Sequence, residues 1–169
     1  MLNEKVSTAM NNQVVAEWFS AYLYLSMSAY FESENLPGFA HWMKIQASEE
    51  YVHGMKFFDY IHERGGKVEL AAIEAPKVKW QSAEEVFADA YKHEQLVTSL
   101  INNLMSIAIE TKDYASVSML NWFVDEQVEE EATADGILQK IKMIGGNSGL
   151  LLQLDKELST RVFTPPTKE

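Results

Sequence analysis

The 169-residue sequence contains no cysteine, which excludes disulfide bonds, iron–sulfur clusters and thiol catalysis. The only prolines are Pro37, Pro76, Pro165 and Pro166. Three long stretches are therefore free of helix breakers. No apolar run reaches the roughly 18 residues that a membrane-spanning helix needs. The opening residues MLNEK lack a basic region followed by an apolar one, so we expect no secretory signal and a cytoplasmic protein.

Positive charge is also in short supply. The chain has 14 Lys and Arg residues against 25 Asp and Glu residues, and its formal net charge is −11 at pH 7. This balance argues against the nucleic-acid backbone as a partner and favours cations. The composition, with 47% hydrophobic and 23% charged residues, is that of an ordinary globular protein. We expect a single domain over residues 1–169, with neither a nucleic acid nor a membrane as partner.

Helical periodicity dominates the chain, because apolar residues recur at three- and four-residue steps. The pattern predicts four long helices, at about residues 3–34, 39–64, 83–110 and 114–144. A capping-box sequence, Ser82-Ala83-Glu84-Glu85, opens the third of them. The bundle thus spans about residues 3–144. Asn147 is the expected cap of a short fifth helix at about residues 147–158, and residues 159–169 resemble a frayed tail.

The lengths of the connections predict the topology. Two are short turns, which join antiparallel neighbours. The segment from Gly66 to Gln81 has about sixteen residues and can reach roughly 50 Å. A helix of about 26 residues is only about 39 Å long, so this segment can cross the whole bundle. We therefore predict an all-α fold: a four-helix bundle with one long crossover and a short C-terminal fifth helix. Apolar residues in the crossover favour its packing on the bundle: Val68, Leu70, Ile73 and Val78.

Polar residues interrupt the apolar stripe of each long helix near its midpoint. They are Glu17; Glu50 and His53; Glu94; and Gln127 and Glu130. Because the midpoints of packed antiparallel helices coincide, all four helices present oxygen ligands at one level. A carboxylate buried in a bundle is costly unless its charge is compensated, and the central stripes contain no Lys or Arg. A cation from outside is the natural compensator, and these ligand types suit iron or zinc.

The sharpest motif is Glu50-Tyr51-Val52-His53, whose i, i+3 spacing places a carboxylate and an imidazole on one helix face. Four-helix di-iron proteins carry a Glu on each of two helices and Glu-x-x-His on each of the other two. This chain departs from that pattern, because its fourth helix carries Gln127-Val128-Glu129-Glu130. The remaining histidines have no partner at ligand spacing and are expected at the surface: His41, His62 and His93.

The whole set resembles the site of the non-haem bacterial ferritins, and the resemblance spans essentially the whole chain. The residues that carry it are Glu17, Tyr24, Glu50, His53, Glu94, Gln127 and Glu130. The resemblance implies one iron held by Glu17, Glu50 and His53. It implies a second iron held by Glu94 and Glu130, with Glu50 bridging the two and Gln127 nearby.

The same resemblance implies further roles. Glu49, Glu126 and Glu129, with Glu130, match the third iron position of bacterial ferritins, which faces the inner cavity. Tyr24 matches the tyrosine beside the centre, a candidate electron donor. Bacterioferritin is less similar, because it would have a His at the position of Glu130 and a haem-ligating Met at the position of Tyr51. No haem is therefore expected.

The implied function is iron storage by a ferroxidase, which oxidises Fe(II) to Fe(III) with O2 or H2O2 and deposits ferric mineral inside a hollow shell of twenty-four subunits. The leucines of the fifth helix are too many for one face of an isolated helix, so partner subunits are expected: Leu150, Leu151, Leu152 and Leu154. An alternative is a di-iron peroxidase or oxidase that stores nothing. A third reading is a metal-buffering shell with a vacant or zinc-filled site. The sequence does not distinguish O2 from H2O2 as the oxidant, since both need the same ligands.

Overall fold

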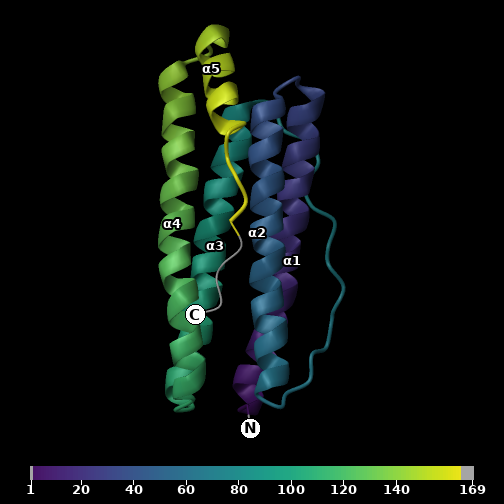
Figure 1. The fold of residues 1–169 in the computed structure, drawn as a ribbon, viewed down its shortest axis with the longest axis vertical. Helices are drawn as coiled ribbons and strands as arrows, with labels where there is room; N and C mark the ends of the chain where they lie inside the picture. The colour runs from purple at the N-terminus through teal and green to yellow at the C-terminus, as the bar shows by residue number, and fades with distance from the viewer. Residues whose placement is uncertain (1, 165–169) are drawn as a thin grey trace.

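The computed structural model describes residues 2–164, and within this range it contains five α-helices and no strand. Their bounds are α1 Glu4–Ser33, α2 Pro37–Glu63, α3 Ala83–Glu110, α4 Tyr114–Ile144 and α5 Ser148–Leu158. The four long helices lie side by side and α5 sits at one end of the bundle (Figure 1). The predicted all-α fold, a four-helix bundle with a short fifth helix, is confirmed. No helix in the described range is long and apolar enough to cross a membrane.

Local sequence signals explain where the helices begin and end. The Ser82 hydroxyl accepts a hydrogen bond from the backbone N–H of Glu85 at 3.1 Å, so Ser82 is the N-cap of α3 as predicted. The Glu85 carboxylate accepts from the N–H of Gln81, one residue before the cap, at 2.7 Å. Asn147 caps α5 through its side-chain oxygen. Gly145 ends α4 in the left-handed conformation, with φ of 58°, which glycine adopts without a Cβ penalty.

The crossover between α2 and α3 runs the length of α1 (Figure 1). Near one end of α1, the Asn11 side chain accepts a hydrogen bond from the N–H of Glu69 at 2.7 Å. Near the other end, the Ser26 hydroxyl donates to the carbonyl of Lys77 at 2.6 Å. Trp80 then buries its ring as the chain enters α3. The backbone of the crossover is thus hydrogen-bonded to α1 near both ends of that helix.

The crossover packs on the bundle as predicted, with Val68 against the core, but the other three apolar side chains that led to the prediction do not contribute. These are exposed on the subunit surface: Leu70, Ile73 and Val78. The hydrogen bonds from α1 hold the backbone without turning those side chains inward.

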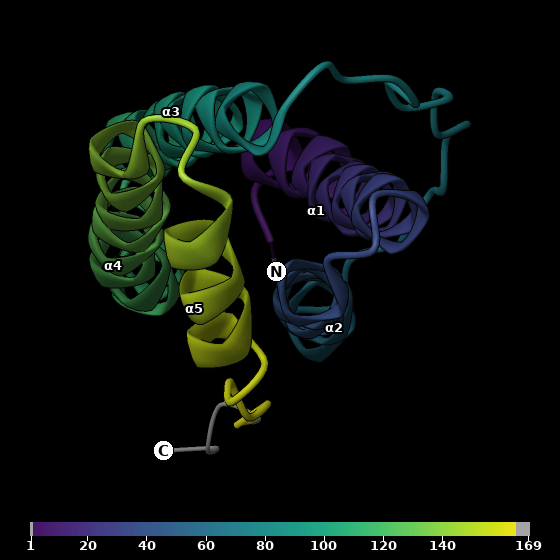
Figure 2. The same cartoon turned by 90° about the horizontal axis from the view of Figure 1, so that it is seen from above.

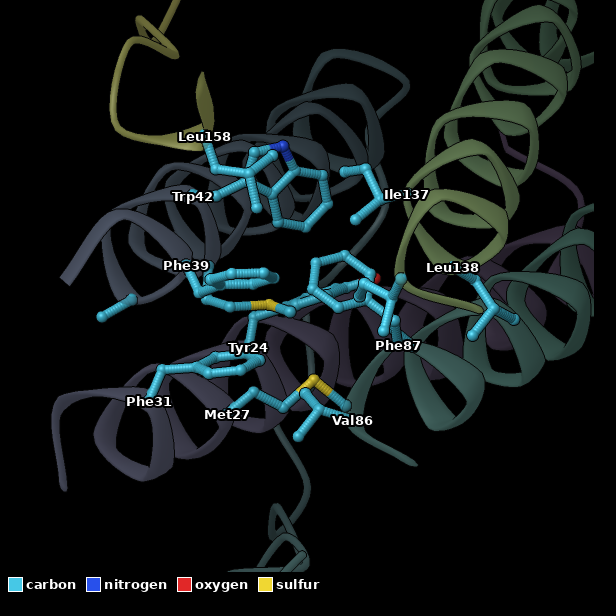
Figure 3. Packing of buried hydrophobic residues seen from close by; sticks show 14 of the residues in the cluster. Tyr24, Met27, Phe31, Phe39, Trp42, Val86, Phe87, Ile137, Leu138 and Leu158 are labelled. Atoms are coloured by element: carbon cyan, nitrogen blue, oxygen red, sulfur yellow. The ribbon is translucent and has the colours of Figure 1, made fainter. Parts of the chain in front are cut away.

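The core consists of two hydrophobic clusters separated by a polar layer. One lies toward α5 and contains Phe31, Phe39 and Phe87, with Leu158 of α5 packed at its edge (Figure 3). The other lies toward the opposite end and includes a stacked pair, Phe57 and Phe123, whose ring centroids are 4.1 Å apart. On each long helix at least one buried polar residue separates the positions that join the two clusters: Glu17 and Ser20 on α1, Glu50 and His53 on α2, His93 and Glu94 on α3, and Gln127 on α4. The layer therefore lies at the mid-height of the bundle.

Residues 159–164, which we expected to fray, lie against α2 (Figure 1). Arg161 Nη2 donates to Gln46 Oε1 at 2.9 Å and forms an ion pair with Glu49. Its guanidinium carbon lies 4.3 Å from the ring centroid of Trp42. These contacts tie the segment down. The rest of the expected tail, residues 165–169, lies outside the described residues.

Candidate metal centre

The polar layer brings together side chains from all four long helices. Glu17 comes from α1, Glu50 and His53 from α2, Glu94 from α3, and Gln127 and Glu130 from α4. Burial is nearly complete: Glu17, Glu50 and Glu94 are each 1% exposed. The residues that the sequence predicted to share one level therefore meet in the structure.

Two triads of potential ligands share one carboxylate. Glu17, Glu50 and His53 offer one ligand atom each within 4.8 Å of one another, and Glu50, Glu94 and Glu130 do the same. Glu50 belongs to both triads, so its two oxygens can face two cations. This is the arrangement that a bridged pair of metal ions requires.

Unpartnered oxygens test whether this donor set fits a cation. Three buried side-chain atoms in the described residues lack a hydrogen-bond partner, and two of them, Glu17 Oε2 and Glu130 Oε2, belong to this centre. The other oxygen of Glu17 accepts from Gln13 Nε2 at 2.9 Å, and that of Glu130 accepts from Gln46 Nε2 at 2.8 Å. Each carboxylate thus has one fixed oxygen and one free. Oxygen and imidazole donors with free lone pairs suit iron or zinc.

The glutamines that fix these oxygens escaped the sequence prediction. Gln13 precedes Glu17 by four residues, and Gln46 precedes Glu50 by four. Gln46 Nε2 also donates to Glu50 Oε1 at 2.7 Å, so this one amide holds carboxylates from two helices. The signal was present, because Gln and Glu at i and i+4 face each other on a helix. It recurs on α1 and α2.

The carboxyl groups of the polar layer differ in the direction in which their pKa values are shifted. Burial, reinforced by the charge of Glu50, raises the pKa of Glu17 and that of Glu94 to about 8 each. Burial and the same neighbour raise the pKa of Glu130 well above its ordinary value. Burial opposes ionisation of Glu50 too, but the hydrogen bond and charge of His53 outweigh it, and the pKa of Glu50 is lowered. Near neutral pH, Glu50 is therefore ionised, whereas the neighbouring carboxyl groups of Glu17, Glu94 and Glu130 are protonated.

His53 is the matching cation. Its Nδ1 lies 3.5 Å from Glu50 Oε2, and its ring meets Trp122 edge-on with centroids 5.3 Å apart. Burial lowers the pKa of His53, but the hydrogen bond and charge of Glu50 raise it to about 9. A metal ion at Glu50 and His53 must therefore displace a proton from the imidazole.

Tyr24 and His93 lie on the α5 side of the centre. The Tyr24 hydroxyl donates a hydrogen bond to Glu94 Oε1, and burial raises the pKa of this phenol. The prediction that His93 lies at the surface is wrong, since it is 9% exposed and its Nε2 lies 2.7 Å from Ser20 Oγ. The error arose because α3 packs against both α1 and α4, so adjacent residues of α3 are both buried. The ring of His93 meets that of Tyr24 edge-on, with centroids 6.3 Å apart.

Gln127 lies beside Glu94. Its Nε2 is 3.4 Å from Glu94 Oε2 and 3.3 Å from Thr98 Oγ1. A hollow of about 280 Å³ between α3 and α4 is lined by Thr98, Gln127 and Glu131, among others. The amide therefore separates this hollow from the centre.

The four carboxylates predicted for a third iron are not gathered in one group. Glu126 and Glu130 offer oxygens within 4.8 Å of a His53 nitrogen and of each other. Glu49 is instead paired with Arg161, and Glu129 is exposed on α4. Burial raises the pKa of both Glu49 and Glu126. Half of the predicted set is thus in place around His53.

Comparison with known proteins gives consistent matches over nearly the whole chain. The family described as "Ferritin-like domain" matches residues 7–144. A bacterial non-heme ferritin of Staphylococcus aureus (strain MRSA252) is 44% identical over 163 residues, which are 96% of this chain and 98% of that protein. An engineered closed form of the Archaeoglobus fulgidus ferritin superposes with a TM-score of 0.96 at 49% identity, covering 97% of this chain and 100% of that one. An open-pore ferritin of the same archaeon gives a TM-score of 0.95 at 48% identity, covering 96% and 100%.

Proposed function

This chain belongs to the ferritin-like family, and from that membership we propose that it is an iron-storage ferritin with ferroxidase activity. The resemblance to non-haem bacterial ferritins predicted from the sequence is confirmed by relatives of that name. The proposed substrate is Fe(II), the oxidant is O2 or H2O2, and the product is a ferric mineral stored in a shell of twenty-four subunits. We propose a cytoplasmic location and no haem.

The observation that carries the proposal is the pair of triads joined at Glu50, with an unpartnered oxygen on each side. Glu17 Oε2 is free in one triad and Glu130 Oε2 in the other. In the described residues no Lys or Arg forms an ion pair with Glu17, Glu50, Glu94 or Glu130. Two cations would supply the missing charge.

The chemistry follows from the ligands. Two Fe(II) ions held by one bridging carboxylate can give one electron each to the same oxidant, so that O2 becomes peroxide or H2O2 becomes water. Carboxylates stabilise Fe(III) over Fe(II), which favours the transfer. The carboxyl groups of Glu17 and Glu94 lose their protons when they bind metal, and Gln13 holds one oxygen of Glu17 so that the other faces the ion.

Further roles belong to the same proposal. Glu17, Glu50 and His53 would hold one iron and Glu94 and Glu130 the other, with Gln127 close by. Tyr24, hydrogen-bonded to Glu94, is the proposed electron donor. Glu126, Glu129 and Glu130, with Glu49, are the proposed third position, where oxidised iron would pause on its way to the mineral.

Storage is favoured over a di-iron peroxidase or oxidase by the surface of the subunit. Large apolar side chains are exposed on every long helix and also on the crossover and α5, where they are Leu70, Ile73, Val78, Leu150 and Leu152. Such residues need partners in an assembly, and a shell provides them on several faces of each subunit.

The test is size-exclusion chromatography with light scattering on the apoprotein, followed by aerobic addition of Fe(II) to the same fraction. We expect a particle of about twenty-four subunits that keeps far more iron in solution than two or three ions per chain. A dimer that binds two ions per chain and precipitates the rest would favour the redox enzyme instead. A large particle without rapid Fe(II) oxidation would favour a metal-buffering shell.

A further inference from the structure

The segment after α5 places one arginine against the α2 side of the metal centre. Arg161 is held by three α2 residues at i, i+4 and i+7: it lies over the Trp42 ring, donates to Gln46 Oε1 and pairs with Glu49. Viewed along the bundle, α5 lies between α2 and α4, and the segment that follows it runs past α2 (Figure 2). The guanidinium therefore reaches the polar layer from outside the four-helix bundle.

This arginine has no equivalent elsewhere around the centre. Among the ion pairs of residues 2–164, Arg161–Glu49 alone joins a Lys or Arg to a carboxylate assigned here to iron. A second cation, Lys56, acts on Glu126 through its charge but forms no ion pair with it, and its nitrogen lies 3.2 Å from the centroid of the Trp122 ring. Lys56 therefore differs from Arg161, because an aromatic face holds its ammonium group and no carboxylate is paired with it.

The pairing removes Glu49 from the remaining ligands of the third position. Glu126, Glu130 and His53 converge within 4.8 Å, but Glu49 is in none of the convergent groups. A cation that binds to Glu49 would meet the Arg161 guanidinium at the same carboxylate. Two cations cannot share that small site without strong repulsion.

We propose that Arg161 is an exchangeable counter-ion of the third cation position: it occupies Glu49 until a metal ion displaces it, and so sets the affinity of that position. The inference rests on the proposed function, because it presupposes the two cations bridged by Glu50. Arg161 acts here as a positioning residue, since it binds a ligand and not the metal.

Displacement of Arg161 should leave the first two cation positions almost unchanged. Gln46 faces Arg161 with its oxygen and faces Glu50 and Glu130 with its nitrogen. Loss of the arginine frees the oxygen, while the two hydrogen bonds from the nitrogen remain. The effect is therefore confined to the third position.

The test is calorimetric titration of the assembled apoprotein with Zn²⁺, which binds without redox chemistry. For Arg161→Gln we expect the third cation per chain to bind about tenfold more tightly than in the wild type, with the first two unchanged. In the wild type, the third equivalent should also change the tryptophan fluorescence as Arg161 leaves the Trp42 ring. Arg161→Gln should lack the part of that change that comes from Trp42, whereas the part from Trp122, whose ring lies beside His53, should remain.

Two further variants make the result specific. Lys140→Gln removes a positive charge paired with Glu157 near α5 and should leave all three affinities as they were. Glu49→Gln should weaken the binding of the third cation. In the Glu49→Gln background, Arg161→Gln should no longer change that affinity. Arg161→Lys, which keeps the charge but not the planar fork, should give a smaller gain and serves if Arg161→Gln does not assemble.

Failure of the role of Arg161 and failure of the proposed di-iron centre give different results in this titration. A third-cation affinity that is unchanged in Arg161→Gln, or a gain that persists with Glu49→Gln, would overturn the role of Arg161. If the wild type does not bind the first two cations, the proposed di-iron centre fails instead.

Discussion

Asp155 Oδ1 accepts a hydrogen bond from the backbone N–H of Gly38 at 2.8 Å, and this contact joins α5 to the start of α2. The same oxygen accepts from the N–H of Phe39 at 3.0 Å. Leu36, the N-cap residue of α2, makes no side-chain cap of its own, so a carboxylate distant in sequence supplies it. The approach requires glycine at position 38, because an ideal Cβ there would lie 1.7 Å from the carbonyl oxygen of Asp155.

Asp155→Ala should destabilise the protein. It leaves two N–H groups at the start of α2 without an acceptor and removes a negative charge from the positive end of the helix, at a cost of about 1–2 kcal/mol. The melting temperature of the apoprotein measures the effect. Glu157→Ala is the matched control, because Glu157 pairs with Lys140 on the exposed surface and should change stability by about 0.5 kcal/mol or less. Equal melting temperatures for the two variants would contradict the capping role.

The height of the candidate metal centre along the bundle could be predicted from the sequence, because it depends only on where polar residues interrupt each helix. Glu17, Glu50, Glu94 and Gln127 each lie near the middle of a long helix, and packing such helices side by side aligns their midpoints. The resemblance to a known family then gave each residue a role. The ends of the helices were predictable for the same reason, since caps such as Ser82 act within a few residues.

Contacts between residues far apart in sequence were not predictable in this way. Arg161 and Glu49 are separated by 112 positions, and the tail composition near Arg161 indicates only a chain end. Asp155 lies 117 positions from Gly38. The burial of His93 was missed because a single helical stripe was assumed for α3, whereas α3 packs against two neighbours. Such features need the tertiary arrangement.

Glu50→Ala should abolish the fast phase of Fe(II) oxidation, slowing it by about a hundredfold or more, because Glu50 is the ligand common to both triads. Stopped-flow absorbance after mixing with aerobic Fe(II) measures the rate. The apoprotein should stay folded with a melting temperature that changes only modestly, because relief of the repulsion that raises the pKa of Glu17 and Glu94 opposes the loss of the ion pair with His53. An apoprotein that unfolds would indicate that Glu50 is structural.

A matched control for that variant is Glu32→Ala. Glu32 pairs with Lys44 where both side chains are about half exposed. Its loss should leave both the oxidation rate and the melting temperature unchanged. A similar loss of activity in Glu32→Ala would show that the assay reports general damage.

Tyr24→Phe tests the hydrogen bond to Glu94. The phenol lowers the pKa of Glu94, so its removal should raise that pKa further and weaken the second cation about fivefold near neutral pH. The ring itself should still pack against Trp42. Zn²⁺ titration at several pH values measures the effect, which should shrink as pH rises. Tyr22→Phe is the control, because Tyr22 is 51% exposed; an equal effect there would exclude a specific role for Tyr24.

The raised pKa values make the stability of the apoprotein depend on pH. Glu17 and Glu94 titrate at about 8 in the folded protein against 4.5 as the ordinary value, so between these values the folded state holds more protons than the unfolded state. Stability therefore falls as pH rises through this window. His53 acts in the same direction: its pKa is raised from 6.5 to about 9, and its contribution is complete below 6.5 and lost above 9. Glu50, with a lowered pKa, contributes above 4.5 and loses its contribution only in acid.

We therefore expect the apoprotein to melt at a higher temperature at about pH 6 than at about pH 9. Glu17→Gln should flatten this slope, whereas Glu32→Gln, a change at an exposed carboxylate, should not. Saturating Zn²⁺ should reverse the slope, because the bound carboxylates and the imidazole of His53 are then deprotonated in the folded state and protons compete with the metal. Melting curves with and without Zn²⁺ at both pH values measure all three effects. A slope that stays the same with Zn²⁺ present would mean that the titrating groups are not the metal ligands.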